Sequence, residues 1–199
     1  MSFTFWFEFA STYSYPAAMQ IEHKAAERGI EVHWQPFLLG PIFQAQGWND
    51  TPFKLFPAKG RYMWRDIERV CDRDGIRFRR PSQFPRSGLL AARIANWHAD
   101  EPWVPAFVRS VYRANFEDDE DIANPGVITN CLAELKLDAA ALLEEGQRPE
   151  AKEALRDATA RAQALGIFGA PFFMAGDEPF WGYDRMEQAL EWYACSGSV

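Results

Sequence analysis

An aromatic strand that runs directly into a helix start, with a serine between them, constrains the fold of this chain more than any other feature. Four phenylalanines recur at a period of two, at Phe3, Phe5, Phe7 and Phe9. This alternation is typical of a strand buried on at least one face. Ser14 can cap the following helix, and we expect Ser11 to lie beside its N-terminus, where unpaired N–H groups and the helix dipole favour an anion.

The next segment completes a strand-helix-strand unit. Pro16 is tolerated in the first turn of the helix, and Gly29 can end it. Residues 30–39 alternate well enough for a second strand that ends at Gly40-Pro41. A crossover helix between two strands places those strands in parallel, so the unit predicts the interior of a sheet.

The middle of the chain shows helical patterns and no convincing strand. Helices are predicted over about 61–71, 88–98, 105–115, 125–131, 138–145 and 149–164. This order indicates a helical block between two sheet-forming ends. We therefore expect one domain made of residues 1–41 and 150–199, and an all-helical insertion domain over residues 42–149.

The C-terminal segment predicts a hairpin and a final helix. Residues 172–174 and 180–181 have the pattern of two short strands with a turn between them. Asp184 can cap a helix that runs to Ala194. A proline at the head of a buried strand must begin the strand or lie at a bend. A cis peptide bond between Ala170 and Pro171 is therefore expected.

Composition excludes several classes of protein. The net charge of −7 argues against nucleic acid or an acidic membrane surface as the main partner. Neither a secretory leader nor a stretch long enough to span a bilayer is visible, so we expect a cytoplasmic protein. The cysteines Cys71, Cys131 and Cys195 are far apart and never form Cys-x-x-Cys. No disulfide framework, zinc site or other metal site is predicted.

Four fragments of the chain carry a family resemblance. They are Phe-Glu-Phe-Ala-Ser-Thr-Tyr-Ser-Tyr over residues 7–15, Pro-Ala-Lys-Gly-Arg-Tyr-Met-Trp-Arg-Asp over 57–66, Gly-Ala-Pro-Phe-Phe over 169–173, and Phe-Trp-Gly-Tyr-Asp-Arg over 180–185. In this order they resemble the DsbA-like branch of the thioredoxin-like fold, an α/β fold with a large all-helical insertion. Within it the chain is similar to the kappa-class glutathione transferases and, more closely, to the bacterial 2-hydroxychromene-2-carboxylate isomerases.

The resemblance implies a glutathione site at the first strand-helix junction. DsbA-type oxidoreductases carry Cys-x-x-Cys where this chain has serines, so a dithiol oxidoreductase of that kind is excluded. Ser11 matches the catalytic serine that hydrogen-bonds the glutathione sulfur. Ala170, just before Pro171, matches the residue whose backbone pairs with the tripeptide as an added strand. The chain departs from the family at Glu8, where an aspartate is common, and at Thr12, where a proline is common.

The resemblance also implies contacts with the two ends of the tripeptide. Tyr183 and Asp184 match the pair that contacts the γ-glutamyl end of glutathione, and Asp184 would form an ion pair with the ammonium group of that end. Lys59 matches the lysine near the glycyl carboxylate. An ungapped count from Lys59 places Asp50 at the family's asparagine, whereas a shift of one residue chooses Asn49.

The aromatic residues offer a candidate substrate pocket. With aromatic side chains at 15% of the sequence, some rings can line a pocket for a flat substrate, among them Trp48, Phe53, Phe84 and Trp181. Arg86 is then available to a substrate carboxylate. Each of these side chains could equally be core or solvated surface.

The function implied is a glutathione-dependent isomerase that acts on a small aromatic carboxylate in the catabolism of aromatic compounds. It would interconvert 2-hydroxychromene-2-carboxylate and trans-o-hydroxybenzylidenepyruvate by reversible thiolate addition. The alternatives are a kappa-class glutathione transferase or peroxidase, which consumes the thiol, and a non-catalytic thioredoxin-like scaffold that binds a peptide or partner. The oligomeric state stays open, with a homodimer as one option.

Overall fold

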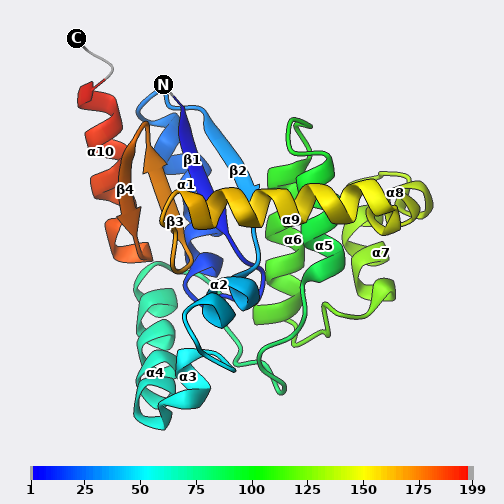
Figure 1. Cartoon of the computed structure of the whole chain (residues 1–199), viewed down its shortest axis with the longest axis horizontal. Helices are drawn as coiled ribbons and strands as arrows, with labels where there is room; N and C mark the ends of the chain where they lie inside the picture. Colours follow the sequence, from blue (N-terminus) through cyan, green and yellow to red (C-terminus); the bar gives the residue numbers. More distant parts are fainter. Residues whose placement is uncertain (1, 197–199) are drawn as a thin grey trace.

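A four-stranded sheet forms the centre of the computed structural model, which describes residues 2–196 (Figure 1). The strands are β1 (Phe3–Phe7), β2 (Val32–Pro36), β3 (Phe172–Ala175) and β4 (Glu178–Trp181), in the order β2-β1-β3-β4. β1 pairs with β2 in parallel and with β3 antiparallel, and β3 pairs with β4 antiparallel. The parallel pairing and the C-terminal hairpin expected from the sequence are both confirmed.

Helices fill most of the remaining chain. In chain order they are α1 (Ser14–Ala26), α2 (Leu39–Ala45), α3 (Pro52–Leu55), α4 (Pro57–Arg73), α5 (Leu89–Trp97), α6 (Val104–Phe116), α7 (Pro125–Glu134), α8 (Ala139–Gln147), α9 (Pro149–Ala164), the 3-10 helix η1 (Tyr183–Arg185) and α10 (Met186–Ser196). Within the described chain, residues 42–149 contain no strand, as the sequence predicts. The division into two domains stays a prediction.

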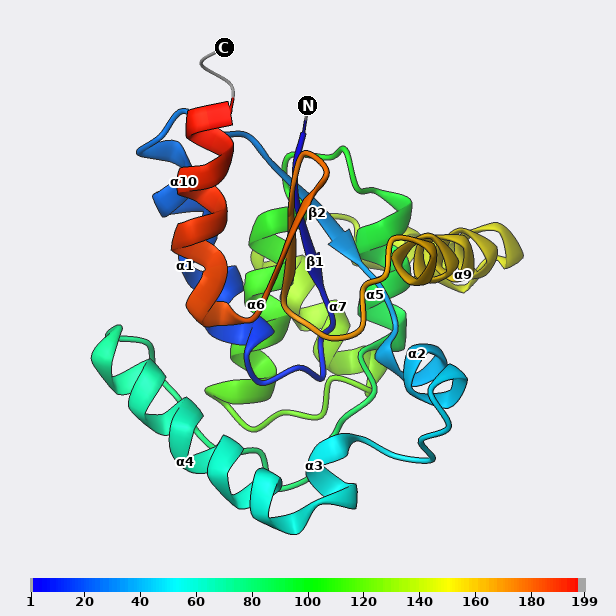
Figure 2. The same cartoon turned by 60° about the vertical axis from the view of Figure 1, so that its left-hand side comes forward.

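Both faces of β1 are buried because its alternating side chains enter two different clusters. Phe3, Phe5 and Phe7 are fully buried on the face covered by α1 and α10, which lie side by side (Figures 1 and 2). The Phe5 ring stacks on Phe173 of β3 with 5.4 Å between centroids. On the opposite face Trp6 packs in a smaller cluster with residues of α2 and α9. β1 is therefore held in place from both sides.

Helix α6 joins the helical part of the chain to the end of β1. Its side chains belong to the same buried cluster as the phenylalanines of β1. The Tyr112 hydroxyl donates to the Glu8 carbonyl at 2.9 Å, and the Asn115 side chain donates to the Phe9 carbonyl at 3.5 Å. The segment that leads to Ser11 is thus fixed by a helix far away in the sequence.

Helices α3 and α4 form a separate arm below the sheet (Figure 2). Toward the C-terminal end of α4, Ile67 and Cys71 enter the main buried cluster, and polar contacts add to this attachment. The Tyr183 hydroxyl of η1 donates to Asp74 at 2.6 Å, and Arg73 donates two hydrogen bonds to the same carboxylate. The hydrogen bonds from Arg73 are the main cause of the lowered pKa of Asp74. In the described part of the chain, no helix has the length and apolar character needed to cross a bilayer.

Candidate active site

Ser11 lies in the turn between β1 and α1. Its backbone N–H donates to the Glu8 carbonyl at 2.9 Å, which closes the turn. Its hydroxyl donates to the Ala170 carbonyl at 2.9 Å and accepts from the Ser14 N–H at 3.2 Å. Ser14 begins α1 instead of capping it from outside, because Ser11 satisfies its N–H. The Ser11 oxygen therefore sits at the N-terminus of α1 and opposite the chain that enters β3.

The peptide bond between Ala170 and Pro171 is cis, as expected. Pro171 is buried, and its carbonyl accepts from the Gly182 N–H at 3.0 Å. This bond ties the start of β3 to the end of β4. Two segments separated by 159 residues thus meet at the Ser11 hydroxyl.

Lys59 lies in the first turn of α4 and is exposed. Its ammonium is 4.7 Å from the centre of the Phe56 ring. Among residues 2–196 it forms no ion pair with a carboxylate, although the helix dipole disfavours a cation at this end. A nearby anionic ligand would supply the missing charge.

Asp50 and Asn49 lie in the loop before α3. The Asp50 carboxylate accepts from the Thr51 N–H at 2.7 Å and lies 3.4 Å from the Lys54 ammonium. It therefore already has two partners, whereas Asn49 is exposed. The choice between the two as a ligand contact stays a prediction.

Tyr183 and Asp184 occupy η1, at the other end of the site. The Tyr183 side chain is buried and its hydroxyl is committed to Asp74. Asp184 is exposed and lies 3.7 Å from the Arg185 guanidinium, a distance that leaves its carboxylate open to another cation. Of this predicted pair, Asp184 has the exposed side chain, and its role as a ligand contact stays a prediction.

Arg86 does not occupy the place the sequence suggested for it. Its guanidinium is buried and donates to Asp119, Ser82 and the carbonyls of Asn115 and Glu120. Hydrogen bonds from Ser82 and Arg86 lower the pKa of Asp119 to about 2, so this carboxylate is ionised. A substrate carboxylate would have to displace Asp119, which argues against the expected role of Arg86.

Phe84 does line a cavity, together with an arginine that the sequence analysis missed. The cavity has a volume of about 270 Å³ between α3, α4 and the loop over residues 80–84. The Phe84 ring meets Trp64 edge to face at 4.8 Å, and the Arg80 guanidinium lies 4.7 Å above the Trp64 ring. Arg80 is exposed and forms no ion pair within the described chain. From sequence, Arg80 cannot be told apart from its solvated neighbours.

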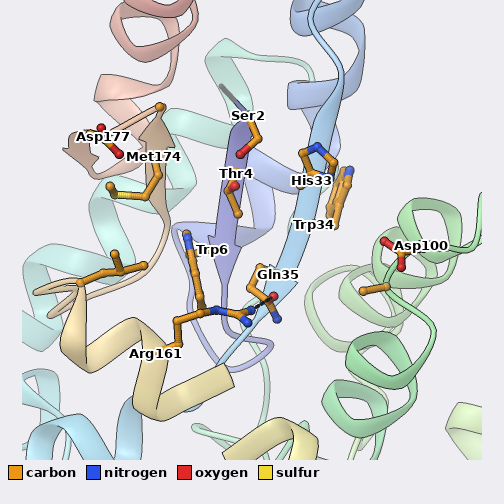
Figure 3. A pocket seen from close by; sticks show the side chains of 13 residues that line it. Ser2, Thr4, Trp6, His33, Trp34, Gln35, Asp100, Arg161, Met174 and Asp177 are labelled. Atoms are coloured by element: carbon orange, nitrogen blue, oxygen red, sulfur yellow. Dashed lines mark hydrogen bonds between the residues drawn. The ribbon is translucent and has the colours of Figure 1, made fainter. Parts of the chain in front are cut away.

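A larger cavity of about 330 Å³ lies over the sheet (Figure 3). Its lining includes Ser2 and Thr4 at the start of β1, whereas Ser11 follows the end of that strand. Arg161 of α9 lies over the Trp6 ring at 5.4 Å and donates to Gln35. Neither this cavity nor the smaller one includes Ser11, Ala170 or Pro171 in its lining.

No cysteine lies at the junction among the described residues. Cys71 and Cys131 are buried in helices, and Cys195 is exposed on α10. Burial is the main cause that raises the pKa of the Cys71 thiol to about 12, so it supplies no thiolate at neutral pH. The same part of the chain contains no group of three or more side chains able to hold a metal ion.

Glu8 is a further titratable group at the junction, which the sequence analysis noted as a departure from the family but gave no role. Its carboxylate accepts from the Ala10 N–H at 3.0 Å. Burial raises the pKa of the carboxyl from 4.5 to about 7. The sequence signal for this raised pKa was a single acidic residue at the end of an aromatic strand. The surrounding rings predict poor hydration of the carboxyl, which raises its pKa.

Comparison with known proteins places this geometry in a family. Residues 3–194 match the DSBA-like thioredoxin domain. The 2-hydroxychromene-2-carboxylate isomerase of Sphingobium xenophagum is 27% identical over 183 residues, which cover 92% of this chain and 93% of that protein. Glutathione S-transferase kappa 2 of Caenorhabditis elegans is 24% identical over 204 residues, covering 96% of this chain and 90% of that protein.

A solved structure of a 2-hydroxychromene-2-carboxylate isomerase superposes with a TM-score of 0.85 at 22% identity, covering 99% of this chain and 97% of that one. The likeness extends over the sheet and the helices between its two halves. The expected fold, a thioredoxin-like sheet with a large helical insertion, is confirmed.

Proposed function

The chain belongs to the family of DSBA-like thioredoxin domains, and from this premise we propose that it is a glutathione-dependent enzyme of the isomerase and transferase kind. The observation that carries the proposal is the Ser11 hydroxyl, held between the Ala170 carbonyl and the Ser14 N–H at the start of α1. A thiol-based enzyme of this fold needs a thiolate at that position. Because the described chain has none there, the thiol must come from a bound cofactor.

The junction suits a thiolate. A hydroxyl can rotate, so Ser11 can turn its O–H from Ala170 toward a sulfur while its oxygen keeps the Ser14 N–H. The N-terminus of α1 adds its dipole, which stabilises a negative charge. When bound, glutathione would supply a thiolate that adds reversibly to a conjugated substrate.

The residues around the junction fit the rest of the tripeptide. The unpaired Lys59 ammonium at the start of α4 suits the glycyl carboxylate. The Ala170 backbone beside Pro171 suits pairing as an added strand. Asp184, next to the buried Tyr183, suits the γ-glutamyl ammonium. Either Asn49 or Asp50 completes the contacts beside α3.

Arg80 and Phe84 provide a place for the second substrate. The cavity that they line has aromatic side chains from Phe53, Trp64 and Phe84, which suit a flat ring, and a guanidinium that suits a carboxylate. We propose a small aromatic acid as substrate, with Arg80 taking the role first expected of Arg86. The reaction proposed is the interconversion of 2-hydroxychromene-2-carboxylate and trans-o-hydroxybenzylidenepyruvate.

The second candidate is a kappa-class transferase or peroxidase activity, which the similarity to glutathione S-transferase kappa 2 favours. The two activities differ in whether glutathione is recovered. Turnover of the chromene acid with unchanged total glutathione supports the isomerase, whereas stoichiometric loss of the thiol supports the transferase.

Thermal unfolding with and without glutathione tests the common premise. A ligand that binds only the folded state raises the melting temperature as its concentration exceeds Kd. We expect such a rise, together with glutathione-dependent turnover that Ser11→Ala reduces. An unchanged melting temperature at saturating glutathione would instead support the non-catalytic scaffold.

A further inference from the structure

The Glu8 carboxyl belongs to the same turn as the Ser11 hydroxyl. The Glu8 backbone carbonyl accepts from the Ser11 N–H and from the Tyr112 hydroxyl, each at 2.9 Å. The Glu8 side chain folds back onto the Ala10 N–H at 3.0 Å. The carboxyl is therefore held in the same turn that the Ser11 N–H closes.

No positive charge balances this carboxyl. Within residues 2–196, no lysine, arginine or histidine side chain lies within ion-pair distance of Glu8. The titratable group that senses Glu8 is Tyr112 of α6, whose pKa is raised first by burial and then by the Glu8 charge, so its hydroxyl stays protonated. The hydroxyls of Thr12 and Ser14 are buried without hydrogen-bond partners in the described chain and carry no charge.

The hydrogen bond to Ala10 does not require an acid. A glutamine in the same place would offer an oxygen to the Ala10 N–H and would avoid the cost of burying a charge. What an acid adds is the ability to take up a proton. Because Glu8 is only partly buried, its carboxyl can exchange protons with water.

We propose that Glu8 holds the proton given up by the thiol that binds at Ser11, so that thiol and carboxyl share one proton. This inference rests on the proposed glutathione site. When the thiol ionises, its S–H bond breaks, the electron pair stays on sulfur, and an O–H bond forms on Glu8 by exchange through solvent. When the thiol is protonated again for release, Glu8 returns the proton.

The physical reason is repulsion between like charges. Two negative charges in one weakly hydrated turn raise each other's pKa, and protonation of one relieves the other. The burial that raises the pKa of Glu8 to about 7 makes the free enzyme ready for this uptake at neutral pH. A carboxyl that is half ionised at pH 7 takes up about half a proton when a thiolate binds in the same turn and raises its pKa well above 7.

Calorimetric titration with reduced glutathione in two buffers of different ionisation enthalpy measures this uptake. At pH 7 we expect Glu8→Gln to release about half a proton more per bound glutathione than the wild type does. The control is Glu31→Gln, which removes an exposed charge before β2 and should match the wild type. Equal proton release by wild type and Glu8→Gln would refute the role of Glu8, whereas no binding heat in any variant would refute the glutathione site itself.

A second measurement needs no variant. In wild-type protein labelled with carbon-13 at the glutamate carboxyls, one signal should titrate near pH 7 without glutathione and at higher pH with saturating glutathione. Assignment follows from the loss of this signal in Glu8→Gln. If every glutamate titrates near the ordinary value, or if glutathione binds and leaves the titration near pH 7 in place, the inference is wrong.

Discussion

Glu8 makes stability depend on pH in a direction that can be worked out. The folded-state pKa of Glu8, about 7, lies above the ordinary 4.5. The contribution of this carboxyl to the unfolding free energy is therefore fully present below about pH 4.5 and is lost as pH rises through 7. Glu8→Gln should therefore gain up to about 3 kcal/mol of unfolding free energy over the wild type at pH 8. Urea unfolding from pH 5 to pH 8.5 measures the gain. A difference that stays constant over this range would contradict it.

Two arginines of the loop after α4, Arg80 and Arg86, should separate substrate binding from stability. Arg80→Ala removes the charged hydrogen bonds proposed for the substrate carboxylate and should raise KM about tenfold at an unchanged melting temperature. Arg86→Met leaves Asp119 without its buried partner and should lower the melting temperature. The control for KM is Arg79→Ala, at an exposed neighbour outside the cavity lining. An effect of Arg79→Ala on KM as large as that of Arg80→Ala would contradict the assignment.

These residues also show where reasoning from sequence reaches its limit. Ser11 and Pro171 were predictable because a turn before a helix and a proline before a strand each restrict the backbone. The commitment of Arg86 to Asp119 was not predictable, since that pairing depends on a loop that lies 33 residues further along the chain. The environments of Arg80 and Glu8 were not predictable either, because they depend on how α4 and α6 pack in the folded protein.

At the level of elements, hydrophobic periodicity predicted the strands and most long helices. β1 and β3 alternate or run apolar, and both are buried as expected. α2 and α3 were missed because helices of 7 and 4 residues are too short to show a period. The expected second strand was too long for a related reason, since β2 ends at Pro36 and α2 begins at Leu39.

The bond between Tyr183 and Asp74 should anchor the α3–α4 arm to the sheet. Tyr183→Phe removes a hydrogen bond to a charged acceptor while keeping the ring, and should cost about 1–3 kcal/mol of unfolding free energy. The control is Tyr62→Phe, at an exposed position of α4. Equal unfolding midpoints for both variants in urea would show that this bond does not anchor the arm.

At the scale of the whole molecule, the buried cluster extends from β1 through α6 to α7 without a break. The helical segment over residues 42–149 is therefore not expected to unfold alone, even if it is a domain by architecture. We predict a single calorimetric transition whose van't Hoff and calorimetric enthalpies agree. Two resolved transitions would indicate that the helical segment and the sheet unfold independently.

The central claim is that Ser11 stabilises the thiolate of a bound glutathione, and ultraviolet titration of that thiolate tests it most directly. In the wild type the bound thiol should have a pKa below the ordinary cysteine value of about 8.5. Ser11→Ala should raise it by about one to two units, because a hydrogen bond to a charged partner contributes about 1.5–3 kcal/mol. Glutathione affinity should change less than turnover, since the tripeptide contacts proposed for Lys59 and Ala170 remain. Identical titration curves for the two proteins, with turnover unchanged, would mean that Ser11 serves only the start of α1 and that the sulfur binds elsewhere.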